Sequence, residues 1–221
     1  METETAVKGR RSIRRFKPEP VPEEIVRDIV NTARWSPSWG NTQPWELYVV
    51  TGEALERFKK ANRRKCLHGE APASDIAMPE VWPETLKKRY VEVGKKVLTS
   101  LSIAREDVEA RNEYYGEMFA LFGAPCMILV CLSKSLHMEY AMLDVGLLMQ
   151  TVCLLAHDRG LGTCILAGSV RYPSLLRELL PIPEDRVVVI GTAMGYPDRA
   201  APVNHFERER AELDEFVTWV S

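Results

Sequence analysis

Two short segments near the start of the chain carry the side chains best suited to chemistry. Residues 10–16 read Arg-Arg-Ser-Ile-Arg-Arg-Phe and gather four guanidinium groups and one hydroxyl within six positions. Arginine stays charged and forms paired hydrogen bonds, so this array is suited to binding a phosphate. Residues 36–45 read Ser-Pro-Ser-Trp-Gly-Asn-Thr-Gln-Pro-Trp and combine turn formers and small polar side chains with two tryptophans. That composition is unusual for a loop that only connects two secondary-structure elements.

A further basic array, Arg208-Glu209-Arg210, lies near the end of the chain. Arginines two residues apart on an extended segment point to the same side, so Arg208 and Arg210 could hold one phosphate together with residues 10–16. The alternative is a solvated basic surface, which is what most runs of charge are. Taken with residues 36–45, the arrays indicate a ligand with an anionic tail and a flat, hydrogen-bonding head, the shape of flavin mononucleotide (FMN).

Two glycine-containing segments have simple structural explanations and weaker functional ones. Gly160-Leu161-Gly162 and Ala167-Gly168 fit a helix stop and a bend, yet small residues also let backbone N–H groups approach a flat ligand closely. Residues 191–195 have the wrong glycine spacing for a dinucleotide fingerprint, so nothing indicates a separate nicotinamide-binding domain. No serine lies in a hydrolase elbow, and we assign no catalytic acid, base or nucleophile.

Composition restricts the class of protein. The 221 residues carry a net charge of −2, which gives no basic field for nucleic acid or for an anionic membrane surface. The odd number of scattered cysteines is typical of reduced thiols in a cytosolic protein, and the histidines have no metal-ligand spacing. Residues 1–8 lack the apolar run of a signal peptide, and residues 141–156 are expected to be too short to span a membrane. We therefore expect a cytoplasmic protein without a metal.

The elements that must position these residues follow from apolar spacing and from helix caps and breakers. We expect one domain over residues 1–221, with a loop and helical excursion at about 66–122. The run at 140–159 is apolar almost all round and predicts a central buried helix. Because strands and helices alternate irregularly, the pattern favours an α+β fold with a small central mixed sheet surrounded by helices. The other helices are expected at 22–36, 53–65 and 173–180, and the strands at 46–51, 124–132, 163–166 and 186–194.

The chain resembles the nitroreductase family of flavin-dependent oxidoreductases. The resemblance is carried by Arg-x-Ser-x-Arg within residues 10–14, by Pro-Ser-x-x-Asn-x-Gln-Pro-Trp at 37–45, by the helix end at 156–162, and by residues 191–197 with 204–210. It covers most of the chain outside residues 60–120. The first two motifs at this separation are specific for the family, whereas either one alone is not.

The resemblance implies an intertwined homodimer with FMN at the subunit interface. The phosphate and ribityl chain would be held by Arg10, Arg11, Ser12, Arg14, Arg208 and Arg210. The other subunit would line the flavin with Pro37, Ser38, Trp39 and Asn41. The backbone N–H groups of Ala167 and Gly168 would lie beside the reactive edge of the ring, and the apolar C-terminus, with Trp219 and Val220, would wrap the partner.

The implied reaction is a ping-pong, two-electron transfer of hydride from NAD(P)H through FMN to nitroaromatic or quinone acceptors. Several family members carry a glutamate where this chain has Ala167, and a deiodinase branch uses a hydroxyl side chain near the flavin that Ala167 cannot supply. The alternatives are a flavin-fragmenting or dehalogenating enzyme of the same fold, and a non-catalytic flavin-binding or anion-binding protein.

Overall fold

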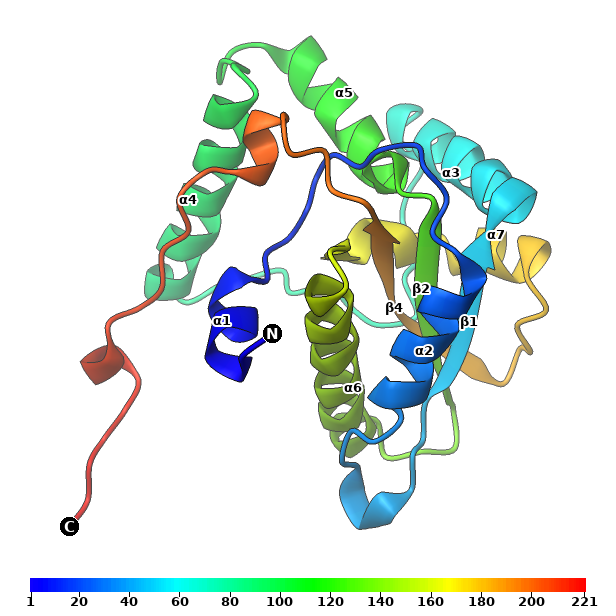
Figure 1. Ribbon diagram of the computed structural model, residues 1–221. Helices are drawn as coiled ribbons and strands as arrows, with labels where there is room; N and C mark the ends of the chain where they lie inside the picture. Colours follow the sequence, from blue (N-terminus) through cyan, green and yellow to red (C-terminus); the bar gives the residue numbers. More distant parts are fainter.

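The computed structural model describes all 221 residues and contains one four-stranded sheet (Figure 1). The strand order is β1-β2-β4-β3, and every ladder is antiparallel. The expected mixed sheet is therefore wrong for this chain in isolation, because its only parallel pairing is the single bridge between Ser12 and Thr163. The strands are β1 (Glu46–Thr51), β2 (Cys126–Ser133), β3 (Gly162–Leu166) and β4 (Arg186–Gly195).

Seven α-helices accompany the sheet. Four agree closely with the expected helices, and the segment at 84–122, expected to be helical, forms two more. The short N-terminal helix has no apolar periodicity and was not predicted. The helices are α1 (Thr3–Gly9), α2 (Glu23–Ala33), α3 (Gly52–Leu67), α4 (Glu84–Ser100), α5 (Val108–Phe119), α6 (Met138–Asp158) and α7 (Pro173–Leu179).

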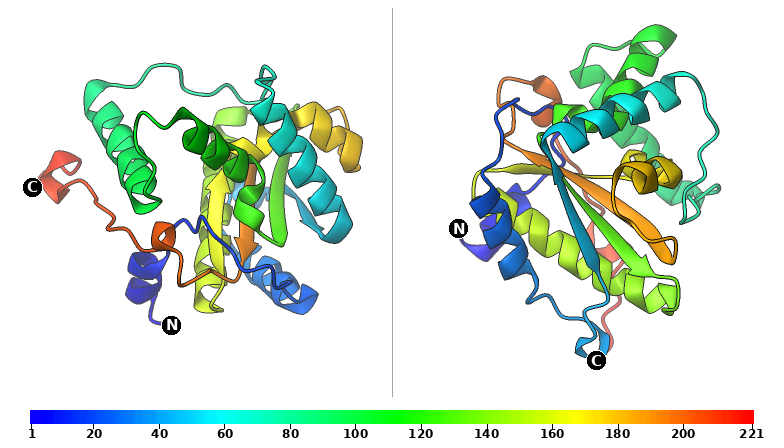
Figure 2. Two further views of the ribbon diagram at one scale, coloured as in Figure 1. Left: turned by 90° about the horizontal axis from the view of Figure 1, so that it is seen from above. Right: turned by 90° about the vertical axis from the view of Figure 1, so that its right-hand side faces the viewer.

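The helices cover both faces of the sheet, and each face has its own hydrophobic core (Figure 2). Helices α2 and α6 pack on one face, and α3 and α7 pack on the other. Strand β2 serves both cores because successive side chains point to opposite faces: Ile128 and Val130 face α2 and α6, whereas Met127 and Leu129 face α3 and α7. This alternation explains why the whole strand is apolar.

The expected central buried helix is present as α6, but it is buried along one side only. Leu148 and Val152 lie in the core, but Tyr140, Leu143 and Leu147 are 58%, 65% and 46% exposed. The spacing of these three places them on one exposed apolar stripe. An apolar stripe left open to solvent in one chain is typical of a contact with another chain.

Helix α6 is also long and apolar enough to cross a membrane by length and composition. The expectation that this stretch is too short is wrong, because the helix extends beyond the apolar run to 21 residues. Within this chain, 44% of its most apolar window is buried.

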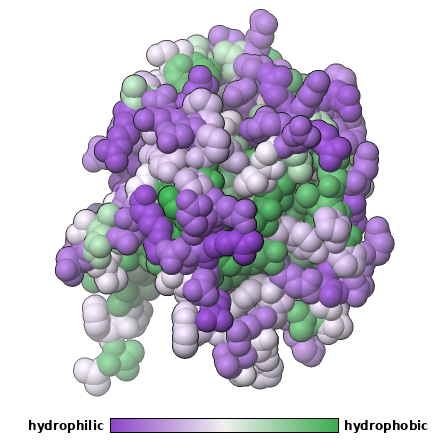
Figure 3. Space-filling model, turned by 45° about the vertical axis from the view of Figure 1, so that its right-hand side comes forward, coloured by the Kyte–Doolittle hydropathy of each residue, from purple (hydrophilic) through white to green (hydrophobic).

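The C-terminal segment leaves the sheet and runs beside α4, away from the main body (Figure 1). Its last residues, including Phe216, Trp219 and Val220, are 68%, 78% and 92% exposed. In Figure 3 this tail projects at the lower left, with hydrophobic side chains near its end. The tail thus carries apolar surface that its own chain does not cover.

Candidate functional site

The arginine-rich segments of the two ends of the chain meet in one cavity of about 700 Å³. The cavity lies between the extended segment after α1, the chain after residue 205 and helix α4. All six residues expected at a phosphate site line it, and we call it the arginine cavity. These residues are Arg10, Arg11, Ser12, Arg14, Arg208 and Arg210.

Strand β3 holds the first segment in place. The Ile13 N–H donates to the carbonyl oxygen of Thr163 at 2.9 Å, next to the bridge between Ser12 and Thr163. This approach requires a glycine in β3, because a Cβ on Gly162 would lie 2.5 Å from Cγ1 of Ile13. The sheet therefore fixes the backbone from which Ser12 and Arg14 extend.

The two arrays are fastened to each other through backbone carbonyl groups. The Arg208 guanidinium donates to the carbonyl oxygens of Lys8 and Arg10, and the Arg11 guanidinium donates to that of Phe206. Asn204 accepts from the Arg14 N–H at 2.7 Å and donates to the carbonyl oxygen of Arg15. Part of the arginine array therefore holds the cavity wall itself.

Positive charges crowd one another in the arginine cavity. Burial, followed by the charges of Arg208 and Arg14, lowers the pKa of Arg11. Burial, followed by Arg210 and Arg10, lowers the pKa of Arg208. The Nε atoms of Arg10 and Arg11 are buried without a hydrogen-bond partner. An anion in the cavity would relieve the repulsion and provide acceptors for further guanidinium donors.

Helix α4 contributes a wall of the cavity that the sequence analysis did not assign. Lys88, Glu92 and Lys96 lie four residues apart and line the cavity together with Arg89. Their i, i+4, i+8 spacing places them on one helix face, which was the available signal. This spacing was not sufficient to predict the cavity wall, because the sequence alone does not show which part of the protein the helix face approaches.

Ala167 and Gly168 follow the far end of β3, about 13 Å beyond Thr163 at the rise of a strand. The side-chain amide of buried Asn62 donates to the carbonyl oxygens of Gly168 at 3.0 Å and of Phe119 at 2.7 Å. Asn62 thereby ties this turn to α3 and α5. It was not predicted, because only the folded chain shows which carbonyl groups it meets.

The loop at 36–45 does not reach the arginine cavity of its own chain. The Trp39 N–H donates to the buried Asp144 carboxylate at 3.0 Å, and the Trp39 ring packs on Tyr140 with centroids 5.6 Å apart. These contacts hold the loop at the start of α6, whereas His157, close to Gly9, lies at the end of that helix. Asp144 and His157 are about 20 Å apart at the rise of an α-helix.

The four residues expected to line the flavin of the other subunit all belong to this loop and point largely to solvent. Trp39 is 70% exposed, and Pro37 and Asn41 are exposed as well. The Ser38 hydroxyl accepts from the Gln43 N–H at 2.9 Å, which stabilises the turn. Within one chain, the predicted site residues of the loop at 36–45 and those of the arginine cavity therefore lie apart.

The cysteines take no part in either group. Cys126, Cys131, Cys153 and Cys164 are buried free thiols, and Cys66 is a half-buried free thiol. Burial raises the pKa of Cys126 to about 12, which makes that thiol a poor nucleophile.

The antiparallel sheet, the helices on both its faces and the arginine cavity together define the class of protein. Residues 7–196 match the model of the Nitroreductase family, and the chain belongs to this family. The resemblance seen in the sequence motifs is thus confirmed.

Individual relatives extend this result. The chain is 34% identical to chloronitrobenzene nitroreductase of Comamonas testosteroni, with 97% of this chain and 95% of the relative covered. It is 33% identical to nitrobenzene nitroreductase of Ectopseudomonas oleovorans, with the same coverage. Its fold matches the crystal structure of the FMN-dependent nitroreductase NfnB from Mycobacterium smegmatis in complex with NADPH, with a TM-score of 0.92 and 30% identity over 99% of this chain and 97% of that one.

Proposed function

We propose that the protein is an FMN-dependent oxidoreductase that reduces nitroaromatic compounds with NAD(P)H. The observation that carries the proposal is the convergence of six predicted phosphate ligands from both ends of the chain on one cavity. Membership of the Nitroreductase family supports it, as do relatives named for nitrobenzene substrates and a similar FMN-dependent nitroreductase that was solved in complex with NADPH.

The arginine cavity fits the phosphate of FMN. Its guanidinium groups repel one another, and the buried Nε atoms of Arg10 and Arg11 have no partner in the chain, so a dianion supplies what the cavity lacks. Arg10, Arg11, Ser12 and Arg14 would hold the phosphate and ribityl chain. Arg208 and Arg210 would add charge from the second array. A charge-assisted hydrogen bond of this type contributes roughly 1.5–3 kcal/mol.

The turn after β3 would lie at the flavin ring. The backbone N–H groups of Ala167 and Gly168 can donate to a flat acceptor edge, and Asn62 fixes the turn by binding the Gly168 carbonyl. When bound, FMN supplies the chemistry of hydride acceptance and electron delivery. The protein contributes binding, orientation and a fixed set of backbone donors, and no side chain is required as an acid or base.

We further propose an intertwined homodimer. The loop at 36–45 lies at the opposite end of α6 from the arginine cavity, so Pro37, Ser38, Trp39 and Asn41 would line the flavin of a second copy. The exposed apolar stripe of α6 and the apolar C-terminal tail supply surface for such an assembly. A contact of this kind is expected to be more hydrophobic than a transient one.

The proposal includes the order of the reaction, the number of electrons transferred and the range of acceptors. The donor and the acceptor use one site in turn, which is a ping-pong order, and two electrons are transferred in each half of the cycle. Quinones are expected as further acceptors. Free cysteines throughout the chain support a reducing compartment such as the cytoplasm.

The proposal is tested by following anaerobic NADPH and NADH oxidation with 4-nitrobenzoate, nitrobenzene and a benzoquinone. We expect oxidation that depends on both the acceptor and bound FMN, with parallel lines in double-reciprocal plots at several acceptor concentrations. A protein that binds FMN but oxidises neither nucleotide would be a flavin-binding protein without this activity. Products of flavin breakdown would instead indicate the flavin-fragmenting alternative.

A further inference from the structure

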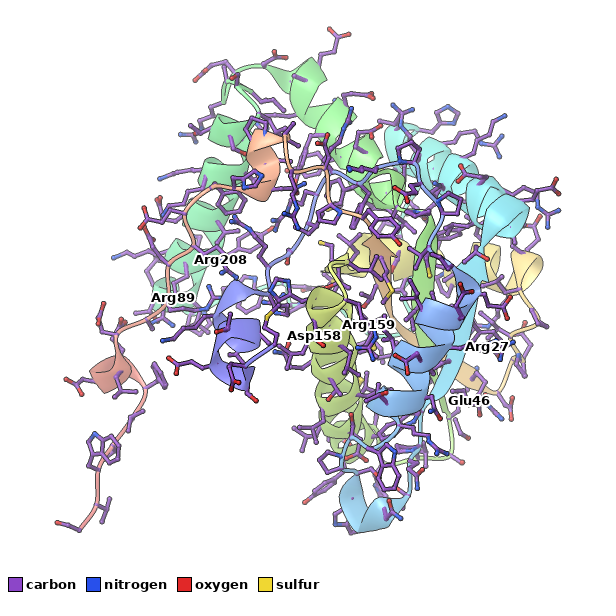
Figure 4. All side chains as sticks on the ribbon, in the orientation of Figure 1. Arg27, Glu46, Arg89, Asp158, Arg159 and Arg208 are labelled. Atoms are coloured by element: carbon purple, nitrogen blue, oxygen red, sulfur yellow. The ribbon has the colours of Figure 1, made fainter.

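The face of α4 that carries Lys88, Arg89 and Lys96 forms a wall of the arginine cavity but has no assigned ligand. Figure 4 labels Arg89 and Arg208 and shows both in the region between α4 and the C-terminal segment. The α4 residues line the same cavity as the two arginine arrays. No anion has yet been assigned to these α4 residues.

The charge of the cavity exceeds what one phosphate can neutralise. Its lining has eight arginine or lysine side chains and four glutamates, an excess of four positive charges, in a chain whose net charge is −2. A phosphate monoester carries at most two negative charges near neutral pH. About two positive charges therefore remain without a counter-charge when a single phosphate is bound.

The ion pairs within the cavity show where the excess lies. Lys96 pairs with Glu209, and Arg89 pairs with Glu215 at 2.7 Å. Lys88 lines the cavity, is exposed, and pairs with no carboxylate. Arg89 keeps further N–H donors, since a guanidinium offers five. Successive helix residues point about 100° apart, but Lys88 and Arg89 both line the cavity, and their long side chains can reach one anion there.

The proposed electron donor brings additional phosphates to this site. NADH carries a pyrophosphate, and NADPH carries a 2′-phosphate as well. Residues 191–195 lack the glycine fingerprint that would bind a pyrophosphate at a helix N-terminus, whereas cationic side chains line the cavity. The cavity volume of about 700 Å³ lies in the range of small-ligand sites and exceeds what a single phosphate group fills.

We propose that Lys88 and Arg89 on α4 form a second phosphate subsite, which binds a phosphate group of the nicotinamide dinucleotide. The inference rests on the proposed function, because it assigns the dinucleotide as electron donor. Two phosphates have the required chemistry: the 2′-phosphate, whose binding would favour NADPH over NADH, and the pyrophosphate, whose binding would serve both.

The test compares Lys88→Ala/Arg89→Ala with Lys87→Ala in the FMN-loaded protein. Lys87 lies on the same helix, is exposed and does not line the cavity, so it controls for the loss of one positive charge from this helix. Calorimetry measures binding of 2′,5′-ADP and of ADP, and steady-state kinetics measure KM for NADPH and NADH. The flavin content of each variant is read from its absorption spectrum.

We expect the double variant to keep its FMN and kcat and to lose roughly tenfold in dinucleotide affinity. A loss for 2′,5′-ADP and NADPH only assigns the 2′-phosphate, and an equal loss for ADP and NADH assigns the pyrophosphate. Unchanged affinities, or a parallel loss of FMN, would overturn the inference while leaving the proposed function intact. A wild-type protein that neither binds FMN nor oxidises NAD(P)H would refute both.

Discussion

Arg14 lines the arginine cavity and directly follows Ile13, which anchors the segment on the sheet. Its N–H group is fixed by Asn204, and its guanidinium lies over the Phe206 ring at 5.6 Å while the adjacent residue, Ile13, is anchored on β3. Arg14→Ala should therefore weaken FMN binding, with little effect on thermal stability. The Kd should rise about tenfold for each ~1.4 kcal/mol of binding free energy that is lost. Fluorescence titration of the apoprotein with FMN measures this.

Arg15→Ala is the matched control for that measurement. Arg15 is the next residue, carries the same charge and does not line the cavity, so its FMN affinity should stay within about twofold of wild type. Equal effects of the two substitutions would mean that the basic segment acts only through its overall charge.

His157 lies at the end of α6, next to Gly9 and close to the charges of Arg10 and Arg208. Burial, followed by the charges of Arg10 and Arg208, lowers its pKa below the ordinary value of 6.5 despite the neighbouring Asp158. Between the lowered pKa and 6.5 the unfolded chain binds a proton that the folded chain does not, so stability is lost as the pH falls below 6.5. His157→Gln should reduce the fall in Tm between about pH 8 and about pH 5.

His68→Gln provides the control for this pH dependence, because His68 is exposed at the end of α3. Its Tm should change with pH as in the wild type. If the His157 variant also follows the wild-type profile, carboxylates elsewhere account for the acid sensitivity.

Trp39 offers a flat, largely exposed ring at the tip of the 36–45 loop. If this loop borders the flavin of a second copy, Trp39 provides a wall on which aromatic acceptors can stack. Trp39→Leu should then lower kcat/KM for a nitroarene more than for an aliphatic nitro compound. An unchanged ratio between the two acceptors would indicate that Trp39 acts only in subunit packing.

At the scale of elements, β3 sets the position of the phosphate-binding segment through Gly162. A side chain at this position would collide with Ile13, which is held between β3 and the core. We expect Gly162→Ala to destabilise the protein by about 1–3 kcal/mol and to weaken FMN binding, because the arginine segment must move. Urea denaturation and flavin titration measure the two effects.

Gly94→Ala is the contrasting substitution. Gly94 lies within α4 with no atom near the position of an added Cβ, so alanine should stabilise the helix by up to about 1 kcal/mol. A Gly162→Ala variant as stable as this control would show that the segment at 10–16 adapts freely.

Many of the elements could be predicted because their signals are local. The strand at Glu46–Thr51 agrees residue for residue with its predicted range, and α2 ends before Pro37 as predicted. By contrast, the antiparallel character of the sheet depends on how distant strands pair. The burial of α6 could not be predicted from its apolar composition, because an apolar face that packs on another chain looks the same in sequence as a core face.

At the scale of the whole molecule, the residues of the arginine cavity could be predicted from both ends of the chain. Clusters of arginine can be recognised in a sequence without knowledge of the fold. The wall formed by Lys88 and Arg89 was not predicted, because α4 carries charges on most sides. Only the fold shows which of its faces lines the cavity. The separation of Trp39 from the cavity is likewise a property of the assembled fold.

The exposed apolar stripe of α6 leads to a prediction about assembly. Leu143 is 65% exposed in the middle of the stripe, and Leu143→Glu should convert a stable dimer into a monomer with reduced FMN content, because each flavin site would lose the loop of the second copy. Light scattering coupled to size-exclusion chromatography measures the mass. Val108→Glu, at the 63% exposed start of α5, should remain dimeric.

A wild-type protein that is monomeric with a full complement of flavin would contradict the shared site. A Leu143→Glu variant that stays dimeric would show that the stripe lies outside the subunit contact.

The central claim, that the arginine cavity holds FMN for electron transfer from NAD(P)H, is tested most directly by the absorption spectrum of the purified protein under anaerobic conditions. We predict a visible flavin band from non-covalent FMN, with about one FMN per chain, that is bleached by NADPH and restored by 4-nitrobenzoate. A colourless protein that takes up no added FMN, or a flavin band that NADPH and NADH both leave unchanged, would contradict the account.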